Sequence, residues 1–489
     1  MSFDLVLFGG TGDLAWRKLL PALFQSFRHG SLPAGGRIIG VGRSEMTEDE
    51  YRALIATRLA EVEADKRPHN GEYAQFAEHL HYLRMDLSHP GDYAALAELL
   101  AQRQADTVVM YLATAPSLFT TVVEQLGASG LATPRTRVVL EKPLGHDLPS
   151  NIAINQAVRQ VFREEQIFRI DHYLGKPSVQ NLLALRFGNT IFEPLWRREN
   201  IASIEISMSE QLGVEKRGEF YDTTGALRDM VQNHALQLLC AIGMEPPISA
   251  DADAIRNEKL KVLQSLKRWT PESLSRDVVR GQYAAGQIGG QPVPGYRQEP
   301  GVSPHSQTET FVALRTEISN WRWAGVPFFI RTGKRLAGRD ASIVVHFRQV
   351  PHAIYRTPMG AANRLVIHLQ PKDGLTLQLM AAAQSQNDAS GMTTLSPAAL
   401  DLDFDQRFGS ERVGAYERLL LDVIAGRLNL FVRADEQEAA WQWVEPILDN
   451  WQQANANGEG PRPYAAGSWG PGAASALVAR DGHFWMEEY

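Results

Sequence analysis

Short apolar runs alternate with longer segments of helical periodicity over about the first 170 residues. Such alternation is typical of parallel strands joined by helical crossovers. Strands are expected at residues 5–8, 37–41, 80–85, 107–113 and 137–140. Helices are expected at residues 14–27, 47–64, 93–103, 117–127 and 148–162. The pattern predicts an α/β region with an open, doubly wound sheet of the Rossmann type.

The pattern changes after about residue 172. β-type alternation without regular intervening helices predicts a mostly antiparallel sheet, with strands at 201–207, 311–316, 343–347, 363–368 and 375–380. Helices are expected at 226–242, 415–425 and 435–453, and Gly/Pro-rich connections at 286–304 and 454–471. A chain of 489 residues exceeds one ordinary domain. We predict an α/β domain at 1–171 and a larger α+β domain at 172–489.

Composition narrows the class of protein. The formal charge of −7 argues against binding of nucleic acid by counterion release. No apolar run approaches the roughly 20 residues that span a bilayer, so no membrane association is expected. The start of the chain carries Asp4 and no basic residues, which is unlike a signal peptide and favours a cytoplasmic protein. The single cysteine, Cys240, excludes an internal disulfide, and no metal ion is expected.

A glycine-rich segment follows the first predicted strand. Its residues are Gly9, Gly10, Thr11, Gly12, Asp13, Leu14 and Ala15. Small residues at positions 9, 12 and 15 let a pyrophosphate approach the backbone at a helix N-terminus. A tight strand-to-helix turn without a ligand uses the same residues, but the position after the first strand of a βαβ unit favours dinucleotide binding.

The end of the second predicted strand bears on the choice of dinucleotide. In this fold an acidic residue there suits the ribose 2′-hydroxyl of NAD, and an arginine suits the 2′-phosphate of NADP. The chain has Arg43 at that place, whose planar guanidinium can bind the phosphate with two hydrogen bonds. NADP is therefore the expected cofactor, although many arginines at strand ends are only solvated surface residues.

Three further motifs carry candidate chemistry. Glu141-Lys-Pro-Leu-Gly145 follows the fifth predicted strand, at the sheet edge where ligands of such folds bind, and Lys142 can reach substrate or cofactor. Arg169-Ile-Asp-His-Tyr-Leu-Gly-Lys176 lies at the expected domain junction and supplies donors and positive charge for a phosphate. In an extended segment its adjacent Asp171 and His172 would point to opposite sides.

The third of these motifs is Gly225-Ala-Leu-Arg-Asp-Met-Val-Gln-Asn-His234, on a predicted helix. Asp229 and His234 are about 140° apart on an ideal α-helix, so they need not share a face. A lone histidine on such a helix is more often structural than catalytic. The sequence alone does not bring these two groups together.

Taken together, these motifs resemble those of glucose-6-phosphate dehydrogenases, in the same order and over nearly the whole chain. The similarity extends to Arg331-Thr-Gly-Lys334, Ala415-Tyr-Glu-Arg-Leu419 and Ala466-Gly-Ser-Trp-Gly-Pro471. The most specific block is the one at residues 169–176. The resemblance implies oxidation of D-glucose 6-phosphate at C1 to 6-phosphoglucono-1,5-lactone with hydride transfer to NADP, the first oxidative step of the pentose phosphate pathway.

The resemblance also implies residue roles. His234 would be the base that removes the C1 hydroxyl proton, and Asp171 its carboxylate partner. A base close to neutral pKa suits a weakly acidic sugar hydroxyl, and a carboxylate on the other ring nitrogen fixes the tautomer. Substrate binding is assigned to His172, Tyr173 and Lys176 at the phosphate, to Glu210, Asp229 and Lys334 mainly at the sugar, and to Lys18 and Arg339. Cofactor binding is assigned to residues 9–15, Arg43, Asp86, Leu87 and Lys142.

Two positions depart from the family pattern. Arg339 stands where family members usually have a second lysine, which keeps the charge and changes its geometry. Pro177 stands where a glutamate is usual, and it is expected to remove a backbone N–H and hold Lys176 in extended geometry. Both changes put the affinity for substrate in question.

Two other functions fit the residues less fully. One is an NADP-dependent dehydrogenase of another sugar or sugar phosphate, against which the cationic phosphate site argues. The other is a non-catalytic NADP-binding sensor or scaffold, against which the retention of Asp171 and His234 argues. The resemblance further suggests a homodimer or homotetramer built through the sheet of the second domain.

Overall fold

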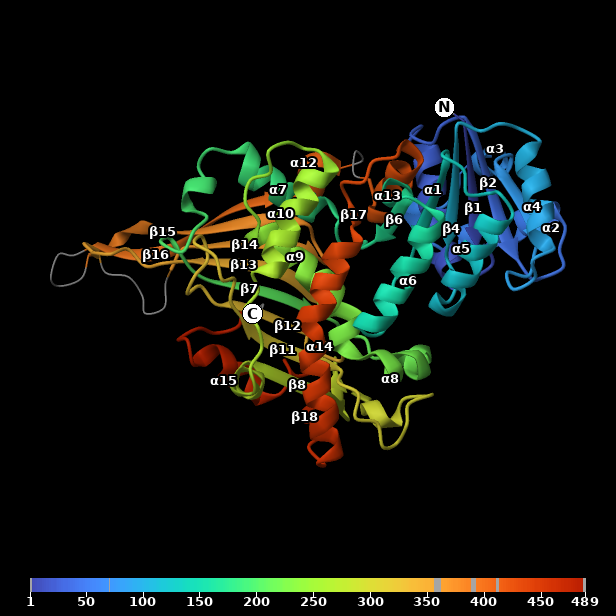
Figure 1. The fold of residues 1–489 in the computed structure, drawn as a ribbon. Coiled ribbons are helices and arrows are strands. Elements are labelled where there is room, and N and C mark those ends of the chain that lie inside the picture. Colours follow the sequence, from blue (N-terminus) through green and yellow to red (C-terminus); the bar gives the residue numbers. More distant parts are fainter. Residues whose placement is uncertain (1, 70, 356–361, 388–392, 410–412, 487–489) are drawn as a thin grey trace. The chain divides into compact units, whose positions relative to one another are not determined.

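The computed structural model describes residues 2–69, 71–355, 362–387, 393–409 and 413–486 (Figure 1). The chain forms two compact units. The first unit comprises Met1–Lys176, Pro247–Asn257 and Val413–Glu438. The second comprises Pro177–Pro246, Glu258–Arg412 and Ala439–Tyr489. The boundary between functional domains, expected after residue 171, stays a prediction.

The first unit is built on a mainly parallel sheet. Its strands have the order β17-β6-β5-β4-β1-β2-β3, and only β17 runs antiparallel to its neighbour. Without β17 this is the strand order of a doubly wound dinucleotide-binding fold. The strands are β1 (Ser2–Phe8), β2 (Gly35–Gly42), β3 (Leu80–Arg84), β4 (Thr107–Leu112), β5 (Thr136–Leu140), β6 (Ile167–Ile170) and β17 (Phe431–Val432).

Helices account for the continuous apolar character of these strands. Six of the seven residues of β1 are buried, because a parallel sheet is covered on both faces. The helices of the first unit are α1 (Leu20–Arg28), α2 (Glu48–Ala60), α3 (Glu72–Ala77), α4 (Asp92–Ala101), α5 (Phe119–Ala128), α6 (Leu148–Val161) and α13 (Ala415–Ala425). The predicted α/β region is thereby confirmed, with β6 and β17 as strands that the sequence did not reveal.

The second unit contains a larger, mostly antiparallel sheet of order β16-β15-β14-β13-β7-β12-β11-β8-β18. Parallel pairing occurs between β12 and β7 and between β18 and β8. The strands are β7 (Ile201–Ser209), β8 (Val278–Ala284), β11 (Phe311–Thr316), β12 (Phe328–Gly333), β13 (Asp340–Phe347), β14 (Arg364–Gln370), β15 (Gly374–Asn387), β16 (Thr393–Asp403) and β18 (Arg462–Ala465). The expected α+β character of this region is confirmed.

Helices and short elements complete the second unit. They include α7 (Pro177–Gly188), α8 (Gly218–Ala226), α9 (Leu236–Gly243), α11 (Pro271–Asp277), α12 (Phe404–Phe408) and α15 (Gly472–Ala479). Two further helices, α10 (Ala252–Gln264) and α14 (Ala434–Ala456), contain points where the chain passes between the units. The connections expected at 286–304 and 454–471 contain regular structure: the hairpin β9 (Gly286–Ile288) and β10 (Gln291–Val293) in the first, and β18 in the second.

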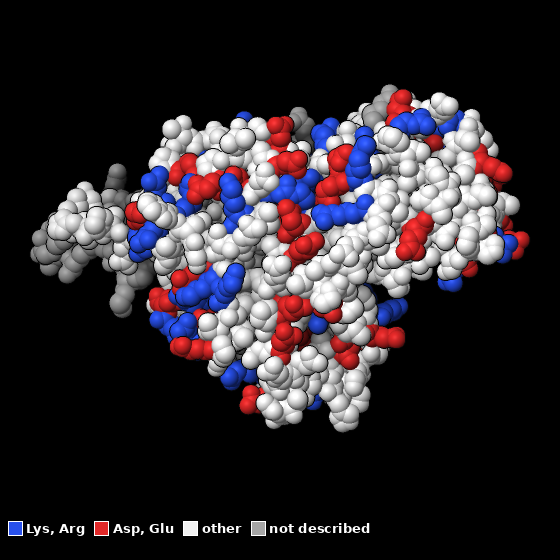
Figure 2. All heavy atoms as spheres, viewed as in Figure 1, with Lys and Arg blue, Asp and Glu red and all other residues white. Residues whose placement is uncertain are grey.

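Charged residues of both signs are interspersed on the face shown in Figure 2. This matches the near balance of 49 Lys and Arg against 56 Asp and Glu. Among the described residues, no helix is long and apolar enough to cross a membrane.

A buried cluster of charged side chains joins the neighbouring strands β1 and β2 of the first sheet. Asp4 of β1 is fully buried and accepts two hydrogen bonds of 2.9 Å from Arg37 of β2. Arg103 donates to the same carboxylate at 2.7 Å. Removing the carboxylate leaves a buried guanidinium without its counter-charge, which is costly in a low-dielectric interior.

We therefore predict that Asp4→Ala lowers the free energy of unfolding by about 3–5 kcal/mol. Urea denaturation measures the loss. Asp106→Ala is the matched control, because Asp106 is exposed and accepts its hydrogen bonds from the neighbouring strand residue Ser2. Equal losses in the two variants would contradict a special role for the buried cluster.

Candidate functional site

The glycine-rich turn after β1 is packed too tightly for any side chain. A Cβ at Gly9 would lie 2.6 Å from the carbonyl oxygen of Ala113, and Gly9 has a φ of +85°. A Cβ at Gly10 would lie 2.6 Å from Cα of Gly40. The backbone N–H groups of Gly9 and Gly10 both donate to the carbonyl of Val41. These contacts hold the turn at the carboxyl edge of the sheet, where such folds bind dinucleotides.

The helix that follows the turn begins with a π-helical stretch, η1 (Ala15–Leu19), and continues as α1. Trp16 donates its indole N–H to the carbonyl of Gly10 at 3.2 Å. Asp13 and Arg17 form an ion pair of 2.7 Å that is largely exposed. Lys18 is also exposed. Of the predicted site residues in this segment, Asp13 and Lys18 are therefore exposed, whereas Ala15 is fully buried.

Arg43 stands directly after β2 with an exposed side chain. Thr11 lies close to the end of this strand, since a Cβ at Gly42 would be 2.9 Å from its Oγ1. The next strand, β3, ends close to Asp86, which is exposed, and Leu87, which is buried. The side chain of Asp86 accepts a hydrogen bond from the N–H of Ser88 at 2.9 Å. These predicted cofactor residues therefore share one edge of the sheet.

The Glu-Lys-Pro-Leu-Gly block contains a buried acid next to Lys142. Glu141 accepts a hydrogen bond of 2.5 Å from the hydroxyl of Tyr111. Tyr416 of α13 is hydrogen-bonded to the same carboxylate. Burial raises the pKa of Glu141, while the bond from Tyr111 and the charge of Lys142 act in the opposite direction. Lys142 itself is half-buried.

Residues 171–176 form a compact turn and not the extended segment that was expected. The side chain of Asp171 accepts the N–H of Tyr173 at 3.0 Å, and its carbonyl accepts the N–H of Leu174. Lys176 then donates its N–H to the carbonyl of Tyr173. Pro177 is the first residue of α7, where a missing N–H costs no helical hydrogen bond. The fold therefore accommodates proline at 177.

Within this turn the aromatic and cationic groups are stacked together. The ammonium group of Lys176 lies 4.0 Å from the centre of the Tyr173 ring. The His172 ring stacks on Tyr416, with centroids 5.9 Å apart and planes 14° from parallel. Lys176 and Tyr173 are buried, and His172 is partly exposed. Tyr416 therefore links the predicted phosphate residues to Glu141.

In the second unit, Asp229 and His234 lie on a π-helical stretch, η7 (Leu227–Ala235), that continues into α9. The N–H of Leu236 donates to the carbonyl of Val231, five residues earlier. In a π-helix the bonded residues are five apart, so positions 229 and 234 follow one another along one side of the helix. The α-helical separation of about 140° does not apply here. His234 is 1% exposed and Asp229 is half-buried.

Glu210 and Lys334, predicted to bind the sugar, form an ion pair. Lys334 is buried at the end of β12, and its ammonium group lies 5.0 Å from the ring centre of Tyr221. Tyr464 donates its hydroxyl to the carbonyl of Lys334 at 2.7 Å. The ammonium group of Lys334 is thus held by Glu210 and Tyr221, and its backbone carbonyl by Tyr464.

Arg339 is exposed and lies just before β13. Arg335 in this region is buried and bonds to Glu215 and Glu299 at 3.1 Å. Its backbone has a positive φ of 53°, unusual for a residue other than glycine. Arg335 has a structural role that the motif did not reveal.

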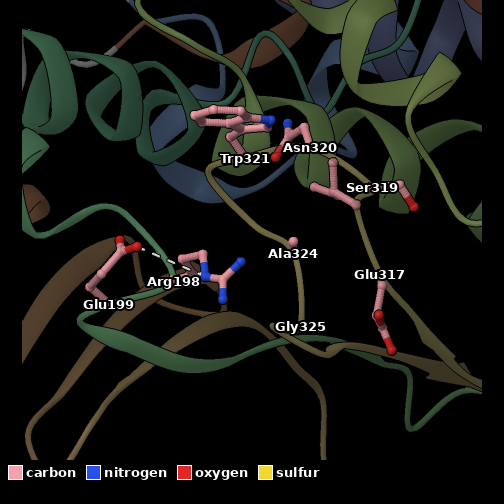
Figure 3. Close-up of a pocket in the computed structure, with 9 residues that line it drawn as sticks. Arg198, Glu199, Glu317, Ser319, Asn320, Trp321, Ala324 and Gly325 are labelled. Carbon is pink, nitrogen blue, oxygen red and sulfur yellow. Dashed lines mark ion pairs between the residues drawn. The ribbon is translucent and has the colours of Figure 1, made fainter.

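A cavity of about 590 Å³ opens elsewhere in the second unit (Figure 3). It is lined by Arg198, Glu199, Glu317, Ile318, Ser319, Asn320, Trp321, Ala324 and Gly325. Arg198 and Glu199 form a long ion pair of 3.9 Å at its rim, and Trp321 is 97% exposed. None of the predicted site residues lines this cavity.

Comparison of this chain with known protein families identifies the family to which it belongs. Residues 6–181 match the model of the glucose-6-phosphate dehydrogenase NAD-binding domain. Residues 183–486 match that of the glucose-6-phosphate dehydrogenase C-terminal domain. The chain belongs to the glucose-6-phosphate dehydrogenase family. Its expected fold class and its expected activity, a dehydrogenase of glucose 6-phosphate, are thereby confirmed.

Individual relatives agree over their full length. The glucose-6-phosphate 1-dehydrogenase of Rhizobium meliloti is 48% identical over 489 residues, covering 99% of this chain and 98% of the relative. That of Mycolicibacterium smegmatis is also 48% identical, with 99% and 97% covered. A solved glucose-6-phosphate dehydrogenase in complex with its substrate glucose 6-phosphate has a TM-score of 0.89, 32% identity and 99% coverage of both chains.

Within this family framework, the structure adds three side chains to those that the motifs predicted. Glu141 and Tyr416 lie inside recognised blocks, and their hydrogen bond depends on a contact between distant segments. Tyr221 lies outside any block and contacts Lys334. The family blocks are the sequence signal for Glu141 and Tyr416, and no motif points to Tyr221.

The raised pKa of Glu141 predicts a pH-dependent stability. Below the ordinary glutamate value of 4.5 the side chain is protonated in both folded and unfolded chains. Above it the unfolded chain loses the proton first, so this group costs stability as the pH rises through its folded-state pKa. Glu141→Gln removes that cost and keeps an oxygen that can accept from Tyr111.

We expect the free energy of unfolding of Glu141→Gln, relative to the unsubstituted protein, to increase as the pH rises above about 4.5. Urea titrations at several pH values measure it. A constant difference over this range would show that the folded-state pKa is not raised.

Proposed function

We propose that this chain oxidises glucose 6-phosphate at C1 to 6-phosphoglucono-1,5-lactone with NADP, with His234 as the base. The observation that carries the assignment of the base is the π-helical stretch that places Asp229 and the buried His234 along one side of a helix. A histidine near neutral pKa is suited to remove the C1 hydroxyl proton as hydride leaves. Asp171 is proposed to hold the imidazole in the required tautomer.

The residues proposed to bind the substrate fall into two groups. His172, Tyr173 and Lys176 are proposed to bind the phosphate, and the Lys176 ammonium group is held on the Tyr173 ring for that purpose. Glu210, Asp229 and Lys334 are proposed to bind the sugar hydroxyls, with Lys18 and Arg339 near the substrate. The Glu210–Lys334 ion pair supplies one acceptor and one donor, a combination that can bind adjacent hydroxyl groups.

The cofactor fits the first unit. Gly9 and Gly10 of the turn leave no room for a side chain, and a backbone of this kind allows close approach of a pyrophosphate. We propose that residues 9–15, Asp86, Leu87 and Lys142 hold the dinucleotide and that Arg43 binds the 2′-phosphate of NADP. Hydride acceptance is the chemistry that the bound cofactor supplies.

We further propose a cytoplasmic enzyme of the pentose phosphate pathway that assembles as a homodimer or homotetramer. The balanced surface charge supports small-molecule substrates over nucleic acid. Family resemblance and the large sheet of the second unit support the assembly.

His234→Asn is expected to reduce kcat by at least 1,000-fold, on the order of the contribution of a general base. The amide retains similar size, so calorimetric binding of glucose 6-phosphate is expected to change little. NADPH formation followed at 340 nm gives kcat. Near-normal turnover in this variant would refute the assignment of the base.

Arg43→Ala is expected to raise the KM for NADP at least 10-fold and to leave the KM for NAD nearly unchanged, because only NADP carries the 2′-phosphate. Arg135→Ala is the matched control, since Arg135 is an exposed arginine of the same unit that donates to the carbonyl of Ala105, outside the proposed cofactor site. Steady-state kinetics with each cofactor measures both. Equal effects of Arg43→Ala on the two cofactors would exclude the phosphate contact.

A further inference from the structure

The helix that carries His234 begins at a sharp break in the chain. Gly225 has φ +74° and ψ 167°, and separates the helical residues of α8 from η7. A residue with a side chain is strained in this conformation. The break exposes the first N–H groups of η7, which have no partner within their own helix.

Glu309 accepts hydrogen bonds from the N–H of Leu227, the first residue of η7, and from the N–H of the residue before it. Its Oε1 accepts the N–H of Leu227 at 3.0 Å, and its backbone carbonyl accepts the N–H of Ala226 at 3.0 Å. Glu309 comes from the segment just before β11, 82 residues away from Leu227. It is only 5% exposed. The sheet of the second unit therefore holds the start of η7 through one residue.

The fit between Gly225 and Glu309 is close. A Cβ at position 225 would lie 2.4 Å from Oε1 of Glu309 and 2.7 Å from its Cδ. The carboxylate thus occupies the space that any other residue at 225 would fill. Glycine at this position is required both by its positive φ and by the approach of Glu309.

The placement of a carboxyl group here is costly. Burial raises the pKa of Glu309, although the N–H of Leu227 and the charges of Arg228 and Arg280 act in the opposite direction. An apolar residue would avoid the cost of burying an acid. It would also leave the N–H of Leu227 without an acceptor.

We propose that Glu309 is a positioning residue for the reaction, which fixes the start of η7 and thereby the placement of Asp229 and His234. This inference rests on the proposed role of His234 as the base. His234 lies seven residues, less than two turns, beyond the N–H that Glu309 holds. A shift of the helix start is therefore transmitted to the imidazole.

The test compares Glu309→Ala with Glu309→Gln. Glutamine has the same length and offers a carbonyl oxygen to the N–H of Leu227, whereas alanine offers none. We expect Glu309→Ala to lower kcat about 100-fold, the scale of a misplaced catalytic group, and to raise the KM for glucose 6-phosphate as well, because Asp229 shifts together with His234. Glu309→Gln is expected to retain kcat within about 3-fold.

The number of binding-competent sites distinguishes a positioning role of Glu309 from a role in stability alone. Calorimetric titration with glucose 6-phosphate gives the number of binding-competent sites, and kcat is expressed per site. A structural role alone would reduce the number of sites and leave kcat per site unchanged, which would overturn the proposal. A Glu309→Gln variant as slow per site as Glu309→Ala would overturn it as well.

Two further variants complete the design. Asp277→Ala removes another carboxylate that is 5% exposed in the second unit, and kcat per site is expected to stay unchanged. His234→Asn distinguishes the two levels of inference. If His234→Asn is inactive and Glu309→Ala is fully active per site, only the positioning role is wrong; if His234→Asn turns over normally, the proposed base is wrong.

Discussion

The π-helical hydrogen bonding of η7 is the constraint on which the chemistry of the second unit depends. It sets the spacing of bonded residues at five, which brings Asp229 and His234 to one side of the helix. A π-helical stretch stores less favourable backbone geometry than an α-helix and persists when surrounding contacts fix it. Gly225 and Glu309 supply those contacts at its start, and the buried face of α9 supplies them at its end.

The first unit shows the same principle at the glycine-rich turn. There too a π-helical stretch, η1, follows a turn that contains a glycine of positive φ, Gly9, and polar groups of Trp16 and Tyr51 converge on the carbonyl of Gly10. Buried polar groups serve comparable ends elsewhere, as Glu141 joins Tyr111 to Tyr416. In each case a polar contact between distant segments sets the position of a segment that carries predicted site residues.

Much of this could be predicted from the sequence, for physical reasons. The parallel strands are continuous apolar runs because helices cover both faces, so they stand out from the polar helix surfaces between them. The strands β6 and β17 were not predicted, because they are too short to show a clear hydrophobic period. The glycines of the turn were recognisable from their spacing, and at Gly9 and Gly10 tight packing permits nothing larger.

The local conformation could not be predicted from the sequence where hydrogen bonds, and not the spacing of apolar residues, determine it. The α-helical period cannot show that residues 227–235 are π-helical, and the alternation of an extended segment cannot show that residues 171–176 form a turn closed by Asp171. The role of Glu309 could not be predicted, because it depends on a contact with Leu227, which is 82 residues away in the sequence. Pro177, which looked like a disruption, is compatible with the fold because it begins α7.

The most direct measurement is one comparison of initial rates: glucose 6-phosphate, glucose and 6-phosphogluconate, each with NADP and with NAD. The account predicts efficient reduction of the cofactor only when glucose 6-phosphate is the substrate. It also predicts a higher kcat/KM with NADP than with NAD. Comparable rates with glucose would contradict the proposed phosphate site, and a preference for NAD would contradict the role of Arg43.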